Sequence, residues 1–454
     1  MTRSATPAWS PAPLALLAWV AGLALSLSLD DPRLRFEAHL GAYALATLGW
    51  WGLARSAPSG RVLALVVGAA VVLRVWALAL PPAFSEDVFR YVYEGRLVWY
   101  LGPGAPFAHP PAAGPGLGLP PGLLDEAWLR INHPEISTIY PPLAQLTFAL
   151  AGGLGELFGG GHLLFLKGLL VAADLGTWAV LALILRARGR PASESLWYGA
   201  SPLVILEVAR EGHADSLSAL GLALGLLGFL SIRLRPRLGY AGFALAALAK
   251  LNGLVVLPAA LRVTRRGLWV ALALCTLLAL PWLLAGPGAG RGLSEYATRW
   301  RAGDGAFGGL LAAAELLLGG DWARVAGVTV TRHQLARALV AVVFAAGALA
   351  ILRPPGRPVA ARAGALLLLL LLLSPTLHPW YVLWILPFAV AGEGFTGRGA
   401  ALLLATLSVL LHHPGWLELR SGEWVDLGWV RGVVHVPVWA LWIRASVRRH
   451  RALG

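Results

Sequence analysis

The sequence is dominated by apolar stretches, several of them long enough to cross ~30 Å of hydrocarbon as α-helices. Only 13% of the 454 residues are charged and the mean hydropathy is +0.68, whereas a soluble protein carries roughly 25% charged residues. We therefore expect an all-α polytopic membrane protein, a single domain over residues 1–454 with about 12–13 transmembrane helices. The expected spans are 13–29, 38–54, 61–80, 162–185, 195–210, 215–232, 267–285, 336–352, 363–377, 380–393, 399–412 and 429–446.

The positive charge of the chain is concentrated between these stretches. The formal net charge is +14. Assigning the arginine clusters to the cytoplasm satisfies the positive-inside rule, so the charge reports topology in the cytoplasmic membrane and no nucleic-acid partner is expected. The clusters are Arg55/Arg61, Arg186/Arg188/Arg190, Arg233/Arg235/Arg237, Arg262/Arg265/Arg266, Arg353/Arg357/Arg362 and Arg444/Arg448/Arg449/Arg451, together with Arg3 and Arg398.

One apolar segment, 238–261, is flanked by basic clusters on both sides. Both flanks should be cytoplasmic, so the segment is expected to be re-entrant, with a break between two half-helices at Lys250-Leu-Asn-Gly253. An ammonium group inside hydrocarbon needs an anionic partner, and no acid lies within two helical turns of Lys250. Its partner is then either a distant carboxylate or a ligand such as a lipid phosphate.

Two long segments are expected to lie on the outer side, 81–142 and 286–335. Within and after the first of them, the amphipathic segments 86–101 and 142–157 are predicted to be helices lying in the outer membrane interface. The second carries further aromatic residues, among them Tyr296 and Trp300.

The segment from Ser85 to Arg96 is the strongest candidate for chemistry. Ser85 is a good N-cap residue, and a helix over 86–101 places Asp87, Arg90, Tyr91 and Glu94 on one polar face. A carboxylate beside an arginine and a tyrosine suits a general base, although ion pairs on an interfacial helix would give the same pattern. No metal or other cofactor is required, but Glu86, Asp87 and Glu94 offer weak ligands for a divalent cation.

Three further polar motifs are predicted on the outer side. The first, 131–142, offers His133 and Tyr140 to a polyhydroxylated ligand, or else forms a rigid loop between its prolines. The second, 207–215, contains His213 and Asp215, of which Asp215 is also explained as a helix cap. The third is 373–384, where His378 lies between prolines in a segment whose tryptophans and tyrosine are typical of an aromatic belt.

Three more charges fall inside predicted helices. Arg74 has no local partner, and we expect it to assist Lys250 in binding a phosphate. Lys167 and Asp174 lie seven residues apart on one face, and we expect them to pair with each other in a structural role.

These motifs together resemble the C-type (GT-C) integral-membrane glycosyltransferases, most of all the bacterial polyprenyl-phosphate-mannose-dependent mannosyltransferases of the family 87 kind. The resemblance covers about residues 74 to 384, in the family's order, and is weak for each motif alone. It is carried by Ser85-Glu-Asp-Val-Phe-Arg-Tyr91, Ile139-Tyr-Pro-Pro142, Glu207…Gly212-His-Ala-Asp215, Lys250 before a helix break and His378-Pro-Trp-Tyr381. One departure is that two additional helices precede the one leading into Asp87.

The resemblance implies Asp87 as the catalytic base and a polyprenyl-phosphate-linked hexose, mannose by preference, as the donor. The acceptor would be a glycan, lipid or protein on the outer face, and transfer would invert the anomeric carbon. The residues expected to bind substrate are Glu86, Arg90, Tyr91, Glu94, His133, Tyr140, His213, Asp215, Lys250, His378 and Arg74.

Two alternatives remain open. One is a transferase for another lipid-linked sugar, such as aminoarabinose, glucose or arabinose. The other is a transporter or lipid flippase, which also uses broken helices and buried charge. The chain shows no two pseudo-symmetric halves, and its polar motifs lie in long outer loops, so the transferase is favoured.

Overall fold

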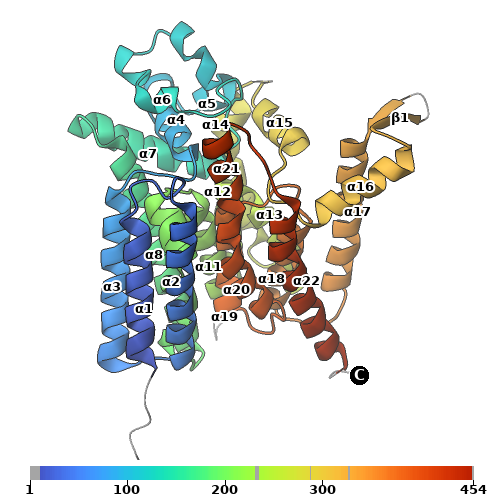
Figure 1. Cartoon of the computed structure of the whole chain (residues 1–454). Coiled ribbons are helices and arrows are strands. Elements are labelled where there is room, and N and C mark those ends of the chain that lie inside the picture. Colours follow the sequence, from blue (N-terminus) through green and yellow to red (C-terminus); the bar gives the residue numbers. More distant parts are fainter. Residues whose placement is uncertain (1–10, 231–234, 287, 326–327, 452–454) are drawn as a thin grey trace, which may run out of the picture.

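The computed structural model describes residues 11–230, 235–286, 288–325 and 328–451, and over these residues the chain is helical except for one short β-hairpin. Long helices lie side by side in a bundle, and shorter helices form a cap at one end (Figure 1). The C-terminal end of the chain lies at the opposite end of the bundle.

The helices of the bundle agree closely with the apolar stretches of the sequence. Among the residues that the structure describes, four helical segments are long and apolar enough to cross a membrane: α3, α8, α17 and the continuous segment Arg398–Ser421. The bundle helices are α1 (Ala12–Leu27), α2 (Phe36–Ser56), α3 (Gly60–Ala79), α8 (His162–Ala187), α11 (Asp215–Leu230), α12 (Pro236–Lys250), α13 (Asn252–Leu261), α14 (Leu268–Leu284), α17 (Arg332–Leu352), α18 (Val359–Leu373), α20 (Arg398–Leu407), α21 (His413–Ser421) and α22 (Gly428–Arg451).

The cap contains the two amphipathic helices expected from the sequence. These are α4 (Asp87–Leu101), which was predicted over 86–101, and α7 (Pro142–Phe158), which was predicted over 142–157. The short helices α5 (Ala105–Ala108) and α6 (Glu126–Leu129) complete this part of the cap. Figure 1 shows all four helices beyond the end of the bundle.

Two predicted spans are broken by proline. The stretch 195–210 consists of α9 (Leu196–Gly199), α10 (Pro202–Val204) and a π-helical turn, Ile205–Arg210, because Pro202 starts a new helix. The stretch 380–393 consists of the 3-10 helix η5 (Pro379–Trp384) and α19 (Leu386–Ala391).

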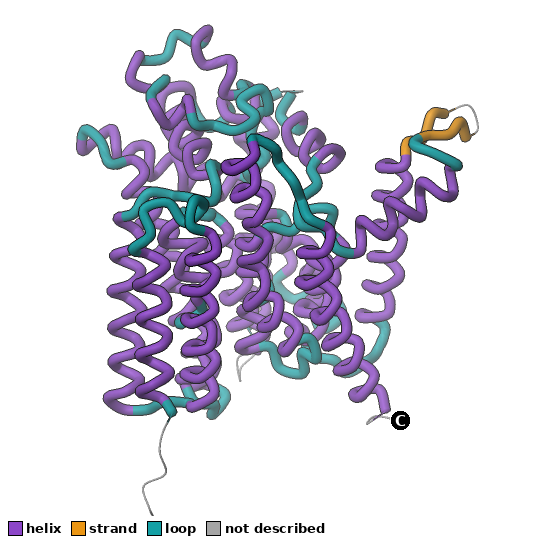
Figure 2. The backbone as a smooth tube through the Cα atoms, in the orientation of Figure 1, coloured by secondary structure: helices purple, strands orange, loops and turns teal. Residues whose placement is uncertain are grey.

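The second outer segment is more structured than expected. It contains α15 (Arg291–Arg299), α16 (Ala306–Leu318) and a hairpin of β1 (Trp322–Val325) and β2 (Val328–Thr331). Figure 2 shows this hairpin at the tip of an arm formed by α16 and α17. Helix α17 begins at Arg332, four residues before the predicted start, because Thr331 and Gln334 form a capping box.

The predicted break in the segment 238–261 is confirmed. Helix α12 ends at Lys250, Leu251 adopts a left-handed conformation with φ of 51°, and α13 begins at Asn252. The new helix turns back along the old one, since a Cβ on Gly253 would lie 2.2 Å from Phe243 O, a residue ten positions earlier. The segment is therefore a helical hairpin with Lys250 at its turn.

Helix α12 also packs closely against α11. A Cβ on Gly242 would come within 2.2 Å of Gly225 N, so only glycine allows the two backbones to approach this closely. The two helices run in opposite directions, and this packing brings the start of α11 at Asp215 next to the end of α12 at Lys250.

Arginines from several predicted cytoplasmic clusters meet at one end of the bundle. Arg188 pairs with Glu393, while Arg190 and Arg398 both pair with Glu194. These contacts join the end of α8 to Glu393, in the loop between α19 and α20, and to Arg398 at the start of α20, so the cluster 186–190 and Arg398 lie at the same end of the bundle. Arg3 and Arg233, and the last two residues of the predicted span 215–232, lie outside the described residues.

Candidate functional site

A cavity of about 310 Å³ opens beside the turn of the α12–α13 hairpin. Its wall is mostly apolar. The polar and charged groups on the wall come from five parts of the chain that are distant in sequence: Tyr140, Lys250 and Asn252, Tyr296, Arg337, and the group Ser374, Thr376, Tyr381 and Trp384. Two of these side chains are cations, Lys250 on the hairpin and Arg337 on α17.

Lys250 has a partner within the protein. Its Nζ lies 3.4 Å from Asp215 Oδ2, and it also lies 5.0 Å and 5.3 Å from the ring centres of Tyr140 and Tyr381. Aromatic faces attract a desolvated cation, so these two rings and the carboxylate together stabilise the charge. Of the two alternatives that the sequence left open, the distant carboxylate is present, and 12% of the Lys250 side chain remains exposed for a ligand.

Asp215 is not part of the cavity wall, and its contact with the site is the ion pair with Lys250. Its side chain is fully buried, and its Oδ1 accepts a hydrogen bond of 2.7 Å from Trp384 Nε1. Asp215 therefore positions the ammonium group, and a substrate in the cavity would not contact this carboxylate.

Asp87 is the first residue of α4, one residue later than the sequence suggested, so that Glu86 occupies the N-cap position. The Ser85 hydroxyl still accepts from the Asp87 amide at 3.2 Å, and Asp87 Oδ2 accepts from the Tyr91 hydroxyl at 3.5 Å. Burial, together with the nearby negative charge of Asp87, raises the pKa of Tyr296 to about 12. Asp87 is half-buried and is not part of the cavity wall, but its charge acts on Tyr296, which is.

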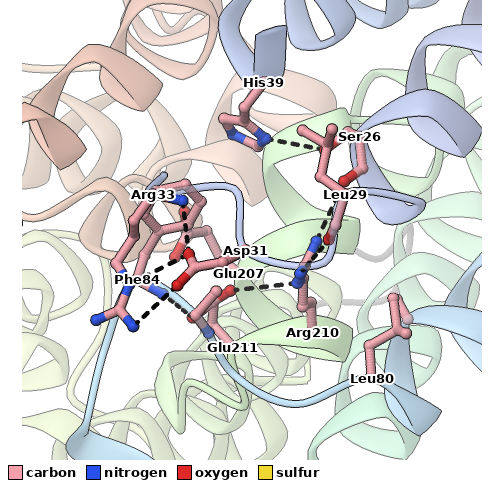
Figure 3. Close-up of polar contacts among 12 residues, drawn as sticks. Ser26, Leu29, Asp31, Arg33, His39, Leu80, Phe84, Glu207, Arg210 and Glu211 are labelled. Atoms are coloured by element: carbon pink, nitrogen blue, oxygen red, sulfur yellow. Dashed lines mark hydrogen bonds and ion pairs between the residues drawn. The ribbon is translucent and has the colours of Figure 1, made fainter. Parts of the chain in front are cut away.

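Glu211 holds the loop that leads into Asp87 through two hydrogen bonds. Its Oε2 accepts hydrogen bonds from the amides of Ala83 and Phe84, at 2.9 and 2.7 Å (Figure 3). Neighbouring Arg210 donates to the carbonyl oxygens of Ser26 and Leu29, which ties the same turn to the end of α1. The motif 207–215, singled out from the sequence as a possible ligand site, therefore also serves to position the catalytic candidate.

Lys167 holds the other end of that loop and does not pair as predicted. Its Nζ donates to the carbonyl oxygens of Leu80 and Ala77, at 2.7 and 3.3 Å. The predicted pairing with Asp174 is wrong, because Asp174 is engaged by Arg74.

Arg74 is buried and cannot serve as the second phosphate ligand. Its Nε donates to Asp174 Oδ2 at 2.6 Å, its Nη1 donates to Gly199 O at 2.9 Å, and its guanidinium lies over Trp178. Its side chain is fully buried, and Arg74 is not part of the cavity wall. The partner lies 100 residues away, which is why local spacing could not identify it.

Arg90 and Glu94 organise the cap, which corrects the expectation that they bind substrate. Arg90 donates to the carbonyl oxygens of Asn132, His133 and Ile136, and it forms an ion pair of 3.6 Å with Glu94. Glu94 also accepts from Thr138 and Gln145, at 2.8 and 2.5 Å. Burial raises the pKa of Glu94, and the nearby Arg90 offsets only part of that effect.

Tyr91 and Tyr140 form an aromatic connection between Asp87 and the cavity. The two rings meet edge to face at 4.7 Å, and Tyr91 also stacks on Phe148 at 4.4 Å. Tyr91 is fully buried, so its hydroxyl can orient Asp87, while Tyr140 forms part of the cavity wall.

His213 and His378 both stack on Trp380, at 3.7 and 4.4 Å, but neither forms part of the cavity wall. His213 is fully buried and lies 3.5 Å from Glu207, which in turn bonds His412 at 2.7 Å. His213 is therefore inaccessible to a substrate, which corrects its expected role, and His378 contacts the cavity only through Tyr381.

The remaining two predicted residues are exposed on the outside of the cap. Glu86 is exposed and next to Asp87. His133 is more than half exposed, has a positive φ of 48°, and packs edge to face on Trp300 at 4.6 Å. Neither belongs to the cavity wall.

Arg337 is a wall residue that sequence reasoning missed. It lies one residue after the start of the predicted span 336–352 and was not singled out, although a charge inside an apolar stretch is a detectable signal. Its Nη1 and Nη2 donate to the carbonyl oxygens of Ala297 and Trp300, at 2.6 and 3.1 Å. These bonds hold the guanidinium between α17 and α15 at the edge of the cavity.

The described residues contain no group of three or more His, Cys, Asp or Glu side chains placed to hold a metal ion, so Glu86, Asp87 and Glu94 do not converge on a cation site. No family model, no curated protein and no solved structure matches the chain. Function must therefore be inferred from the geometry and from the motifs.

Proposed function

We propose that this protein transfers a hexose, mannose by preference, from a polyprenyl-phosphate donor to a glycan, lipid or protein acceptor. The observation that carries the proposal is a largely apolar cavity with two cations, Lys250 and Arg337, on its wall. The Asp87 carboxylate lies outside that wall and is linked to it through Tyr91 and Tyr140. An isoprenoid chain needs an apolar surface, and its phosphate needs positive charge. The motif resemblance to the GT-C mannosyltransferases supports the same activity.

The proposed site lies at the outer surface of the cytoplasmic membrane. Support comes from α17, of which only 6% is buried within the protein over its most apolar window, and from α3, of which 28% is buried. Such helices need an apolar solvent around them. The arginine-rich end would face the cytoplasm by the positive-inside rule, which leaves the cap and the cavity on the outer side.

Each charged residue has a defined part in the proposed reaction. Asp87 accepts the proton of an acceptor hydroxyl, and the acceptor oxygen then attacks the anomeric carbon of the donor sugar. The bond between that carbon and the phosphate oxygen breaks on the opposite face, so the configuration inverts. The departing phosphate keeps the electron pair, and Lys250 and Arg337 stabilise the charge that it gains.

Radiolabelled donors test this proposal directly. The purified protein is incubated with polyprenyl-phosphate mannose, glucose, arabinose or aminoarabinose and an extract of membrane acceptors, and transfer of label is measured. Mannose transfer is expected. Transfer of another sugar, without transfer of mannose, would assign a different donor to the enzyme. Movement of unchanged donor across a vesicle membrane, without transfer to an acceptor, would establish the transporter alternative, which the broken α12–α13 hairpin also allows.

The Asp87→Asn variant tests the assignment of the base. General-base catalysis contributes ~10²–10⁴-fold, so turnover should fall by that factor while the protein folds normally. Glu86→Gln is the matched control, because Glu86 is adjacent and exposed. Equal activity of Asp87→Asn and the wild type would remove Asp87 from the chemistry.

A further inference from the structure

A second and larger pocket, of about 570 Å³, lies between the first turns of α16 and α22. None of its wall residues belongs to the Lys250 cavity. Glycines from both helices form much of the wall and leave the space open: Gly305, Gly308, Gly309, Gly428 and Gly432.

Two arginines from distant segments face this pocket and share one carboxylate. Arg301 Nε and Arg431 Nη1 lie 3.0 and 2.6 Å from Oδ1 of Asp304, whose side chain is fully buried. Asp426 lies 3.6 Å from Arg431 Nε but is not part of the wall, and it accepts from the Gly303 amide. The two guanidinium groups therefore have two carboxylate partners, Asp304 on the wall and Asp426 beside it.

The amino-terminal ends of two helices point to the same place. Helix α16 has 13 residues, and the preceding Gly305 gives it no side-chain cap. Helix α22 has 24 residues and begins at Gly428. Residues of both first turns belong to the pocket wall. Free amide groups at a helix start carry partial positive charge and favour an anion.

His435 gives independent evidence that a ligand is missing. It is only 3% exposed, it belongs to the wall, and its Nε2 bonds the Gly303 carbonyl oxygen at 2.8 Å. Its Nδ1 has no hydrogen-bond partner among the described residues. Buried polar atoms in proteins are nearly always paired, so this unpaired nitrogen at a charged pocket indicates that a polar ligand completes it.

We propose that this pocket binds a phosphate group at a site separate from the Lys250 cavity. The phosphate oxygens would accept from the two arginines and the helix amides, and a ligand hydroxyl would donate to His435 Nδ1. Val436 and Trp439 of α22 add apolar surface to the wall, which suits a phospholipid headgroup with its adjoining chain. The same polar chemistry also accepts a soluble phosphate.

Thermal unfolding of the full-length protein in an uncharged detergent distinguishes these sources. A ligand that binds the folded state raises the unfolding midpoint by mass action. The additions are dioleoyl phosphatidylglycerol, inorganic phosphate, and dioleoylglycerol as the phosphate-free lipid. A lipid site predicts a rise with phosphatidylglycerol alone, a soluble-phosphate site predicts a rise with inorganic phosphate as well, and dioleoylglycerol should have no effect in either case.

Gly432→Leu identifies the pocket as the place of binding. A Cβ at Gly432 meets no atom within 4 Å, so the leucine fills the pocket without disturbing the fold or removing a charge. Gly415→Leu in α21 is the matched control, because it is also helical, equally open and outside the pocket. Gly432→Leu should raise the Kd for the phosphate ligand by roughly tenfold or more. Equal stabilisation of the two variants, or no stabilisation of the wild type, would overturn the proposal.

Arg431→Gln provides a second variant that acts through charge instead of volume. Arg420→Gln is its control, since Arg420 is exposed on α21 and pairs with Glu37 away from the pocket. Arg431→Gln should reduce the stabilisation by phosphate or phosphatidylglycerol, and Arg420→Gln should leave it unchanged. A loss of the same size in both would indicate nonspecific attraction to the basic surface and contradict a built site.

Discussion

Lys250 and Asp215 face each other at the ends of two antiparallel helices, with Nζ 3.4 Å from Oδ2. The pair exists because α11 and α12 pack glycine against glycine, which brings the end of one helix beside the start of the other. Asp215 is fully buried and Lys250 nearly so. The pair therefore combines a structural function with the phosphate-binding function proposed for Lys250, and the two can be separated by mutation.

The single variant Lys250→Met should lose both stability and transfer. It leaves the Asp215 carboxylate buried without its cation, which typically costs about 3–5 kcal/mol. The double variant Lys250→Met/Asp215→Asn removes both charges and should recover most of the thermal stability while transfer stays low. Equal unfolding midpoints for the two variants would show that the pair is not coupled, and transfer by the double variant would exclude Lys250 from catalysis.

Glu211 is expected to act on activity through the position of Asp87. Glu211→Ala removes the acceptor for the amides of Ala83 and Phe84, so the loop before Asp87 loses its fixed position. We expect kcat to fall with little change in the KM for the donor, because the cavity around Lys250 is unchanged. Glu211→Gln retains an acceptor oxygen and should recover part of kcat. A change confined to stability, with kcat unaffected, would leave Glu211 with a purely structural role.

The sequence predicted the helices of the bundle and cap well, because apolar stretches and amphipathic faces are local properties. The break at Lys250–Gly253 was also found from a local argument, the basic residues on both flanks. The helix break at Pro202 and the division of 380–393 between Trp384 and Leu386 were missed, although Pro202 and Pro387 are local signals, because the apolar character continues across both. The β-hairpin of β1 and β2 was not expected, because only β2, Val-Thr-Val-Thr, alternates apolar and polar residues, and it does so over just four positions.

The candidate site was predicted only in part, because its charges are partnered across long sequence distances. Arg74 looked free because its partner Asp174 lies in another helix. Arg90 looked like a ligand because the backbone carbonyl groups that it binds cannot be read from residue types. Conversely, Arg337 lies inside the predicted span 336–352 and was not recognised as a wall residue. Each of these errors concerns a side chain whose environment is set by tertiary packing.

The α12–α13 hairpin should be sensitive to the smallest substitution at its turn. Gly253→Ala places a Cβ 2.2 Å from both Ala247 N and Phe243 O, so the two half-helices must move apart. We expect a clear decrease in the unfolding midpoint and weaker donor binding, since Lys250 moves with the turn. Gly68→Ala, on a helix surface where a Cβ meets no atom within 4 Å, should be neutral or slightly stabilising. Similar midpoints for the two variants would contradict the close packing of the hairpin.

The proposed orientation in the membrane can be tested with two serines. Cys275 is the only cysteine, so Cys275→Ala gives a background without thiols. Ser421 is the last residue of α21, and its neighbour Arg420 pairs with Glu37 at the start of α2. Ser59 follows the other end of α2, so the two serines are separated by the 21 residues of this helix, a rise of ~30 Å. Both serines are exposed. An impermeant maleimide applied to intact cells should label Ser421→Cys and not Ser59→Cys. The reverse result would invert the topology and place the cavity in the cytoplasmic leaflet.

Glu94 should make the stability of the cap fall as the pH rises. Burial raises its pKa in the folded state above the unfolded value, so the folded protein holds the proton more tightly. Its stabilising contribution is complete below the unfolded pKa and is lost as the pH rises through the folded pKa. Glu94→Gln cannot ionise, and its midpoint relative to wild type should therefore increase with pH over that window.

Glu156 provides a control of opposite sign on α7. Burial opposes ionisation there too, but hydrogen bonds from Arg96, Tyr100 and His162 together lower the pKa of Glu156. Its contribution is complete above the unfolded pKa and is lost as the pH falls through the folded pKa, so Glu156→Gln should become less stable than wild type as the pH rises. Unfolding midpoints measured from about pH 4 to pH 8 should show the two variants diverging from wild type in opposite directions. Parallel curves for Glu94→Gln and wild type would mean that the carboxyl group ionises as freely in the folded cap as in the unfolded chain, and that Arg90 with its surrounding hydrogen bonds fully offsets the cost of burial.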